Sequence, residues 1–287
     1  MKKTLYVSDL DGTLLNDVSV IDEESRTILN DLSGDGAAIT VATARTPATV
    51  TGLLDGIDLT MPAIVMTGAA FYDLKSGQYS HMHFLRRKTV EKSLEVFANN
   101  GINPFVYTWK SDNRLHAFHS RNLNDVEEEF YRIRRDMGLK IFHLGELPNE
   151  FALDHTLLIF AVGNRDHFME VKPVLEEAIG YPVSYYNDIL HENTGFIEVF
   201  GEGVSKAAAV ETMKSEWKFD EVVVFGDNLN DIPMMQVADI AVAVENSYPE
   251  VKDFADEVIG RNTEQSVAKF IRDHFFNKKG DDSISVD

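Results

Sequence analysis

Short apolar strands alternate with helices at both ends of this chain, and that alternation constrains the fold more than any other feature. In the first eighty residues, three β-rich runs enclose helical segments at 22–36 and 47–57: TLYVSDL (4–10), AAITVATAR (37–45) and PAIVMTGAA (62–70). Strand–helix units this short join parallel strands through right-handed crossovers. The sequence therefore predicts a parallel sheet with helices packed against it.

The same alternation returns late in the chain. A helix is expected over 203–217, buried strands over 221–227 and 239–246, and a closing amphipathic helix over 266–275. The polar residues 277–287 (NKKGDDSISVD) are expected to be frayed.

The middle of the chain follows a different pattern. Val90, Leu94 and Phe97 form one helical stripe, and the runs 102–109 and 114–120 flank turn residues, which indicates a hairpin. A second helix, strands near 139–145 and 155–163, a helix over 165–179 and strands near 182–187 and 195–200 follow. Helices followed by paired strands are typical of an α+β domain with antiparallel pairing. We therefore expect residues 1–83 and 196–287 to form one α/β core, into which residues 84–195 are inserted as an α+β domain.

The charge balance excludes several classes of partner. The net charge is −20, whereas nucleic acids and anionic membranes bind basic surfaces. An anionic substrate must then be held by a metal ion or by a few selected Lys and Arg. The chain has no cysteine, and no apolar run approaches the roughly 20 residues of a membrane span. We expect a cytoplasmic protein without a signal peptide, and a monomer by default.

Two aspartates follow the first strand, in the motif DLDGT (9–13). Residues i and i+2 of an extended chain point to the same side, so Asp9 and Asp11 can face one pocket from a single strand end. Two carboxylates in different surroundings can divide acid and base chemistry between them, and an aspartate that attacks phosphorus forms an aspartyl-phosphate. Taken alone, such a pair is better explained as a turn or a helix cap, so the other motifs must decide.

Three further motifs follow the ends of expected strands, where ligands bind in open α/β sheets. Thr43 follows AITVA, and its hydroxyl can bond a phosphoryl oxygen beside a helix N-terminus. Lys206 begins a helix, where the helix macrodipole disfavours a cation. A lysine at this position can be there to bind an anion. Asp227 and Asp231 lie in GDNLND (226–231) after a buried strand, and hard oxygen ligands of this kind suit Mg²⁺.

Together, DLDGTLL, VATAR, GVSK and FGDNLND resemble, in order and spacing, the four motifs of the haloacid dehalogenase (HAD) superfamily. More narrowly, the chain is similar to the Cof-type phosphatases, which carry a large α/β cap of the C2 type between the second and third motifs. The resemblance spans the whole chain. It implies an α/β fold: a Rossmann-like parallel-sheet HAD core with an inserted α+β cap domain.

The resemblance also assigns roles to individual residues. Asp9 is implied to be the nucleophile and Asp11 the general acid and base, and both bind Mg²⁺ together with Asp227, Asp11 through its backbone carbonyl. The residues implied to bind the transferring phosphoryl group are Thr43, Lys206, Leu10, Ala44 and Asn230. Supporting positions are Asp231, Gly226 and Asn228, and candidate substrate contacts are Arg45, Gly68 and His191. Asp11 separates phosphatases from dehalogenases in this superfamily, because a leaving alkoxide needs a proton and a halide does not.

The expected reaction is the Mg²⁺-dependent hydrolysis of small phosphorylated metabolites, such as sugar phosphates or phosphorylated cofactors. One alternative is a phosphomutase, in which the phosphoryl group passes from Asp9 to a sugar instead of to water. The other is a non-catalytic ligand-binding protein on the same scaffold, against which the intact set of motif residues counts. The histidines His81, His83 and His191 lack the close spacing of a zinc site.

Overall fold

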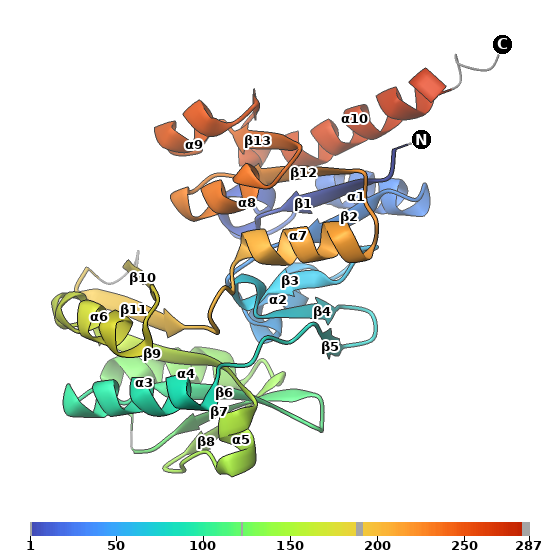
Figure 1. The fold of residues 1–287 in the computed structure, drawn as a ribbon. Coiled ribbons are helices and arrows are strands. Elements are labelled where there is room, and N and C mark those ends of the chain that lie inside the picture. Colours follow the sequence, from blue (N-terminus) through green and yellow to red (C-terminus); the bar gives the residue numbers. More distant parts are fainter. Residues whose placement is uncertain (1, 122, 188–191, 283–287) are drawn as a thin grey trace. The chain divides into compact units, whose positions relative to one another are not determined.

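The computed structural model describes residues 2–121, 123–187 and 192–282, and the chain divides into two compact units (Figure 1). Residues 1–80 and 205–287 form the core unit, and residues 81–204 form the inserted unit. The second boundary expected from the sequence, between residues 195 and 196, falls inside strand β11 (Thr194–Val199). Since β11 pairs along its length with β9 (Thr156–Asn164), it belongs to the sheet of the inserted unit.

The core unit is built on a five-stranded parallel sheet in the order β14-β13-β12-β1-β2. Its strands are β1 (Thr4–Ser8), β2 (Ala38–Val41), β12 (Glu221–Gly226), β13 (Ile240–Val244) and β14 (Glu257–Ile259). β1 lies between β2 and β12, with Val7 paired to Thr40 and to Val224. This confirms the predicted parallel sheet, and it brings the ends of the first and last motif strands to the same edge.

Helices cover both faces of this sheet. They are α1 (Glu23–Gly34), α2 (Pro47–Leu53), α7 (Lys206–Glu216), α8 (Ile232–Gln236), α9 (Pro249–Phe254) and α10 (Ser266–Asp282). Successive residues of a strand face opposite sides. Accordingly, Leu5 and Val7 of β1 join a buried cluster with α7, α8 and α9, while Tyr6 contacts His274 of α10. These apolar strands are buried on both sides, as in other parallel sheets.

The run PAIVMTGAA, predicted as one strand, is interrupted in the structure. Its first part is β3 (Ala63–Val65), followed by a 3₁₀ turn at Met66–Gly68 and by β4 (Ala70–Asp73). Positive φ angles at Met66 and Thr67 break the extended chain. β3, β4 and β5 (Gln78–Ser80) then form a small antiparallel sheet, and a single parallel bridge from Ile64 to Ala42 continues the core sheet.

The closing helix runs further than its sequence indicates. α10 extends through Asp282, so the prediction that the chain frays from residue 277 is wrong up to that point. An ion pair between Lys278 and Glu221 of β12 ties this part of α10 to the sheet. Residues 283–287 lie outside the described part of the chain.

The inserted unit contains a six-stranded sheet in the order β10-β11-β9-β6-β7-β8. Besides β9 and β11, its strands are β6 (Phe105–Lys110), β7 (Arg114–His119), β8 (Lys140–Leu144) and β10 (Ser184–Asn187). Its helices are α3 (Arg87–Asn99), α4 (Asp125–Arg135), α5 (Glu150–Asp154) and α6 (Arg165–Ile179). The predicted hairpin is confirmed, but β7 and β8 pair in parallel because α4 forms a crossover between them.

Aromatic and aliphatic side chains divide between the two faces of this sheet. Ile159 and Ala161 of β9 pack in one buried cluster with α3 and α6. Phe160, on the opposite face, stacks on Phe130 of α4 and on Phe196 of β11. The period-2 alternation of a strand therefore gives the inserted unit its own core.

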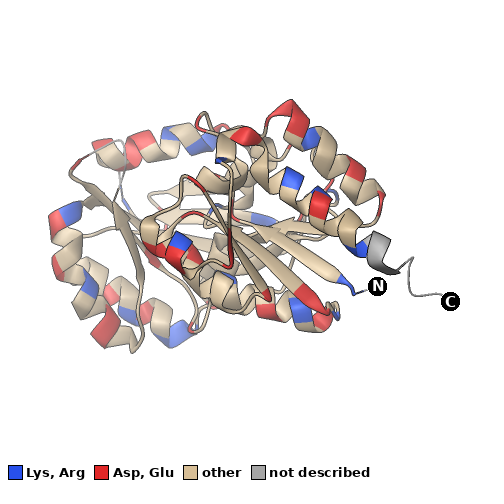
Figure 2. Cartoon of the chain, turned by 90° about the horizontal axis from the view of Figure 1, so that it is seen from above, with Lys and Arg blue, Asp and Glu red and all other residues tan. Residues whose placement is uncertain are grey.

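Charged residues lie on the helices and loops of both units, with Lys and Arg interspersed among the more numerous Asp and Glu (Figure 2). No helix in the described ranges is both long and apolar enough to cross a membrane.

Candidate active site

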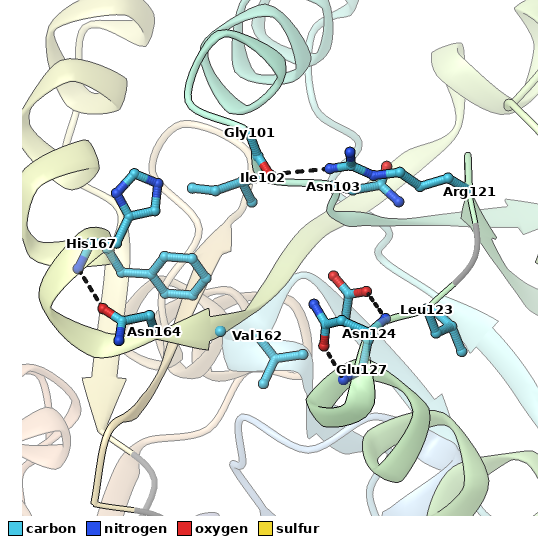
Figure 3. Close-up of a pocket in the computed structure, with 12 residues that line it drawn as sticks. Gly101, Ile102, Asn103, Arg121, Leu123, Asn124, Glu127, Val162, Asn164 and His167 are labelled. Atoms are coloured by element: carbon cyan, nitrogen blue, oxygen red, sulfur yellow. Dashed lines mark hydrogen bonds between the residues drawn. The ribbon is translucent and has the colours of Figure 1, made fainter.

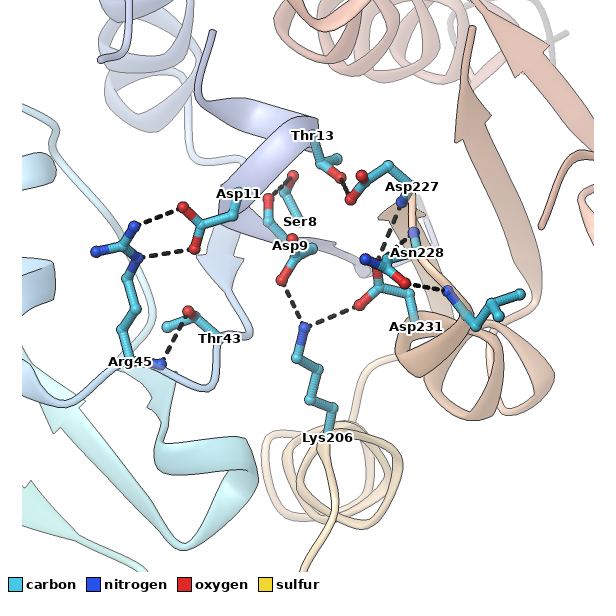
Figure 4. Close-up of polar contacts among 11 residues, drawn as sticks. Ser8, Asp9, Asp11, Thr13, Thr43, Arg45, Lys206, Asp227, Asn228 and Asp231 are labelled. Carbon is cyan, nitrogen blue, oxygen red and sulfur yellow. Dashed lines mark hydrogen bonds and ion pairs between the residues drawn. The ribbon is translucent and has the colours of Figure 1, made fainter. Parts of the chain in front are cut away.

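Four motifs distant in sequence meet at the carboxyl edge of the core sheet (Figure 4). Asp9 follows β1, Thr43 follows β2 and Asp227 follows β12, while Lys206 is the first residue of α7. The Asp9 N–H donates to the Phe225 carbonyl oxygen at 3.0 Å, which continues the β1–β12 pairing one residue past the strand end. Asp9 is thereby held, buried, at the level where β12 ends.

The chain after Asp9 forms a tight turn over Asp227. The turn spans Leu10–Leu14 and closes with a hydrogen bond of 2.8 Å from the Leu15 N–H to the Leu10 carbonyl oxygen. Gly12 has a φ of +79°, and a Cβ at this position would lie 2.4 Å from Asp227 Oδ2. Only glycine satisfies both conditions. Thr13 Oγ1 donates to Asp227 Oδ1 at 3.0 Å, so this turn and the fourth motif are packed as one piece.

Lys206 links two buried carboxylates. Its Nζ donates to Asp9 Oδ1 at 2.5 Å and to Asp231 Oδ1 at 2.8 Å. Ser205 caps α7 through a hydrogen bond from the Ala208 N–H to Ser205 Oγ, which sets the position at which the lysine leaves the helix. The carboxylates of Asp9 and Asp231 therefore stabilise the Lys206 ammonium, which the helix dipole alone would disfavour.

Asp231 stabilises the loop that follows β12 through hydrogen bonds to its backbone. Its Oδ1 accepts from Lys206, and its Oδ2 accepts from the N–H groups of Asp227 and Asn228, both at 3.2 Å. Asp231 is fully buried. Both of its oxygens are engaged within the protein, which agrees with a supporting position.

Burial and mutual repulsion shift the carboxyl groups of this site. Burial raises the pKa of Asp9 to about 7, the charge of Lys206 opposes this, and the charges of Asp231 and Asp227 add to it. Burial, with a contribution from Asp231, raises the pKa of Asp227 to about 6. Burial alone would lower the pKa of Lys206, but Asp9 and Asp231 outweigh it and hold that pKa above its ordinary value. One ammonium thus faces three carboxyl groups, and the site favours a further cation.

Two carboxylate oxygens are available to such a cation. Oxygens of Asp9, Asp227 and Asp231 lie within 4.8 Å of one another. Among the described residues, no hydrogen-bond donor contacts Asp9 Oδ2 or Asp227 Oδ2, while Asp231 is fully engaged. One or two free carboxylate oxygens are what Mg²⁺ takes from a protein. The donor set therefore fits a hard divalent cation.

Asp11 is separated from this cluster and bound by Arg45. Arg45 Nε donates to Asp11 Oδ2 at 2.7 Å and Arg45 Nη2 donates to Asp11 Oδ1 at 2.6 Å, a bidentate pair. The Asp11 side chain is 50% exposed, in contrast to buried Asp9. The two aspartates of the motif therefore have the different surroundings that a division of acid and base work requires.

Thr43 and Ala44 present donors beside Asp9's strand. Thr43 is buried, and its Oγ1 accepts from the Arg45 N–H at 3.1 Å, which leaves its hydroxyl hydrogen to donate elsewhere. The Ala44 N–H has no acceptor within the described ranges. Both groups remain candidates for phosphoryl oxygens.

The remaining predicted positions lie around this centre or outside it. Leu10 is buried in the turn, and Gly226 ends β12. Asn228 and Asn230 are exposed in the loop after β12. Gly68 lies in the 3₁₀ turn that packs against Ser205, beside the start of α7. His191 lies outside the described residues. The roles of all these residues stay predictions.

Sequence reasoning missed the loop that follows β13. Asn246 Nδ2 donates to the Gly12 carbonyl oxygen at 2.7 Å, and Ser247 Oγ donates to the Gly226 carbonyl oxygen at 3.2 Å. Only their position in the sequence could have indicated these two residues, because both follow the end of a parallel strand, where sites form in α/β sheets.

The inserted unit contains a cavity of about 430 Å³, between the first turns of α4 and α6 (Figure 3). Asn124 and Asn164 line it, and each caps its helix by accepting a backbone N–H at 2.9 Å, from Glu127 and His167 respectively. Arg121 donates to the Gly101 carbonyl oxygen. None of the predicted site residues lines this cavity.

Comparison with known proteins gives a consistent result. Residues 6–271 match the family model of haloacid dehalogenase-like hydrolases. A Bacillus subtilis protein named 5-amino-6-(5-phospho-D-ribitylamino)uracil phosphatase YcsE is 28% identical over 270 residues, which cover 93% of this chain and 94% of that protein.

Solved structures share the whole fold. A haloacid dehalogenase-like hydrolase from Bacteroides thetaiotaomicron superposes with a TM-score of 0.75 at 20% identity, covering 96% of this chain and all of that one. The HAD subclass IIB sugar phosphatase BT4131 gives a TM-score of 0.68 at 18% identity, covering 95% of this chain and 98% of that one.

Proposed function

The chain belongs to the haloacid dehalogenase-like hydrolase family and is one of its Cof-type phosphatases, and from that premise we propose that it hydrolyses small phosphorylated metabolites with Mg²⁺ through an aspartyl-phosphate on Asp9. One observation carries the proposal. A buried carboxylate with one free oxygen, Asp9, lies beside Lys206 and Asp227, and a second aspartate two residues later is half exposed.

Asp9 is positioned to act as the nucleophile. Lys206 holds its Oδ1 within the buried cluster, and of its two carboxylate oxygens one would attack phosphorus while the other would bind the metal. A phosphoryl group in transit carries negative charge on its oxygens, so catalysis depends on positioning and on fixed positive charge. Lys206 supplies that charge and the Thr43 hydroxyl a hydrogen bond. Mg²⁺, held by Asp9, Asp227 and the Asp11 carbonyl, would neutralise the charge between the nucleophile and the phosphate.

Asp11 is positioned to move protons. The leaving alkoxide takes a proton from Asp11 as the Asp9–phosphorus bond forms and the ester bond breaks. Asp11 then takes a proton from the water that attacks the phosphorus of the aspartyl-phosphate, which releases phosphate and restores Asp9. Arg45 donates to both oxygens of Asp11 in this structure, so this ion pair must open before Asp11 can carry the proton that it gives to the leaving group.

Sugar and polyol phosphates are the substrate class we propose. The relative from Bacillus subtilis is named for a phosphoribitylamino compound, and one structural neighbour is a sugar phosphatase. Both names describe an alkyl phosphate ester on a hydroxylated chain. Such an ester has a poor leaving group, which agrees with an acid at Asp11.

The proposal is tested by phosphate release from a panel of phosphorylated sugars, polyols and cofactors, with and without Mg²⁺. We expect release by the native protein to require Mg²⁺ and to fall by at least about 10³-fold in Asp9→Asn, because the nucleophile is lost. Asp58→Asn removes an exposed aspartate that pairs with Lys75, and it serves as the matched control with unchanged activity. Equal release by Asp9→Asn and native protein across the panel would refute hydrolysis through Asp9. Transfer to an added sugar in place of water would identify a mutase.

A further inference from the structure

Two asparagines tie the turn that carries Asp11 to the far strands of the core sheet. Asn246 follows β13 and Asn262 follows β14. Neither residue belongs to the four motifs. Asn246 is half buried and Asn262 is buried.

Their side chains form a connected path of hydrogen bonds. Asn246 Nδ2 donates to the Gly12 carbonyl oxygen at 2.7 Å, and its Oδ1 accepts from the Asn262 N–H at 3.0 Å. Asn262 Nδ2 donates to the Leu15 carbonyl oxygen at 2.9 Å. Two side-chain amides thus hold two carbonyl groups of the turn, one next to Asp11 and one at its end.

The Gly12 carbonyl group is a sensitive point to hold. Gly12 is in the left-handed region and has no side chain, so its peptide groups rotate more easily than those of other residues. Asp11 immediately precedes it and is half exposed. Apart from Arg45, no described side chain donates to the Asp11 carboxylate. The peptide geometry of the turn sets the position from which the Asp11 side chain extends, and Arg45 holds the two oxygens at its end.

The same loop also fixes the fourth motif. The Tyr248 N–H donates to the Asp227 carbonyl oxygen at 3.0 Å, and Ser247 Oγ donates to the Gly226 carbonyl oxygen at 3.2 Å. Three consecutive residues, Asn246 to Tyr248, therefore contact the backbone of both the first and the fourth motif. A displacement of this loop changes the placement of Asp11 relative to Asp227.

We propose that Asn246 is a positioning residue, which holds the Gly12 peptide so that Asp11 can deliver its proton to the leaving group. This inference rests on the proposed function, because it assumes the acid role of Asp11. It does not place Asn246 in contact with substrate. A misplacement of about 1 Å at a reacting group can lower a rate by about 100-fold, so the loss of one such hydrogen bond has a measurable effect.

Asn30 provides a matched control. Its Nδ2 donates to the Gly56 carbonyl oxygen at 2.9 Å, and its Oδ1 accepts from the Asp58 N–H at 2.8 Å. Asn30 thus makes the same two kinds of hydrogen bond as Asn246, in the same unit, but on α1 and away from the motifs. Asn246→Ala and Asn30→Ala remove equivalent bonds, and thermal unfolding of both variants measures the purely structural cost.

The decisive readout is the dependence on the leaving group. kcat/KM is measured for the best alkyl phosphate of the panel and for p-nitrophenyl phosphate, whose leaving group departs without a proton. For Asn246→Ala we expect kcat/KM to fall about 10- to 100-fold with the alkyl ester and several-fold less with the aryl ester. Asn30→Ala should change both values equally and little. If Asn246→Ala does not fold, Asn246→Ser, which keeps a hydroxyl donor, is measured in its place.

The outcomes separate this inference from the function on which it rests. Equal losses with both esters, or losses no greater than those of Asn30→Ala, would overturn the positioning role while leaving the phosphatase proposal intact. A native protein without Mg²⁺-dependent release from either ester would overturn both. A selective loss with the alkyl ester, at a melting temperature that matches Asn30→Ala, would establish the role of Asn246.

Discussion

Among the residues whose burial is described, each unit buries one lysine, and the surroundings of the two lysines have opposite effects on their pKa values. Lys206 of the core unit is 5% exposed and Lys140 of the inserted unit is 4% exposed. Lys206 makes hydrogen bonds to Asp9 and Asp231, and its pKa lies above the ordinary value. The pKa of Lys140 is lowered to about 7, mainly by burial. The positive charge of the nearby Arg134 adds to this lowering, and the charge of Glu198 opposes it only in part.

The surroundings of Lys140 are aromatic. Its Nζ lies 4.2 Å from the centre of the Tyr107 ring, and no described carboxylate pairs with it. Glu198, also buried, accepts from Tyr186 Oη at 3.1 Å, and burial raises its pKa to about 7. Here burial drives both an acid and a base toward their neutral forms.

The difference shows what a buried charge needs in order to persist. A buried ammonium stays charged when carboxylates lie within hydrogen-bond distance, as at Lys206, and it tends to lose its proton when they do not. Only the first arrangement can present a fixed positive charge to a phosphoryl group. We expect substitution of Lys206 to lower the free energy of unfolding and substitution of Lys140 to raise it, and three measurements test this difference.

The largest effect is expected for Lys206→Met. This change removes the ammonium and leaves the buried carboxyl groups of Asp9 and Asp231 without their partner. We expect a loss of about 3–5 kcal/mol in the free energy of unfolding, measured by denaturant titration in chelator. We also expect phosphatase activity to fall by at least about 10³-fold, because a fixed charge on the phosphoryl group is lost. A stable, active variant would contradict the role given to Lys206.

A smaller effect is expected in the pH dependence of metal binding. The pKa values of about 7 at Asp9 and about 6 at Asp227 lie above the ordinary 3.8, so the metal-free protein holds protons there that the unfolded chain releases. These two groups therefore make the free energy of unfolding fall as pH rises from about 4 to about 7. Mg²⁺ competes with the same protons, so its affinity should rise by up to about tenfold per pH unit for each proton displaced.

Calorimetric titration with Mg²⁺ between pH 5.5 and pH 8 measures this dependence. An affinity that does not change over this range would show that the metal does not displace protons from Asp9 and Asp227. Asp9→Asn removes one of the two groups and should flatten the pH dependence.

The smallest effect is expected for Lys140→Met. Because the pKa of Lys140 is lowered from 10.5 to about 7, the folded state binds this proton less tightly than the unfolded chain. The native protein therefore gains stability as pH rises from about 7 toward 10.5, and below pH 7 the full cost of the buried charge remains. We expect Lys140→Met to retain activity and to be more stable than native protein at pH 6, by about 1 kcal/mol, with a smaller difference at pH 9.

Denaturant titration at pH 6 and pH 9 measures whether Lys140→Met is more or less stable than the native protein. A destabilised Lys140→Met variant at pH 6 would show that the lysine is held by a favourable contact with Tyr107. The contrast between the two lysines would then fail.

Much of the core unit was predictable because its signals are local. Short apolar strands such as β1 and β12 end directly at the acidic motifs. Because the carboxyl ends of parallel strands lie at one edge of a sheet, these motifs are expected to lie close together. The lysine at the first position of α7 was recognisable because it opposes the helix dipole. Order along the chain and side-chain type were enough to place Asp9, Thr43 and Asp227 at one edge of the sheet, and the catalytic roles of these residues stay predictions.

The errors arose where long-range contacts decide the structure. At the break over Met66–Gly68, the Met66 and Thr67 N–H groups donate to the carbonyl oxygens of Arg45 and Thr43. Gly68 lies against Ser205, which is more than a hundred residues away in sequence. The extension of α10 depends on Glu221 of β12. The bond from Asn246 to Gly12 joins residues 234 positions apart, and nothing in the local sequence VENS distinguishes it from an ordinary loop.

The role of Asp9 as nucleophile is tested most directly by identifying the phosphorylated residue during turnover. The protein is mixed with Mg²⁺ and the best substrate of the panel, quenched in acid within milliseconds, and analysed by peptide mass spectrometry. We expect one phosphoryl group on the peptide that contains Asp9, at the position of Asp9, and none in Asp9→Asn. Continued turnover with no phosphorylated residue, or with the phosphoryl group on another side chain, would contradict it.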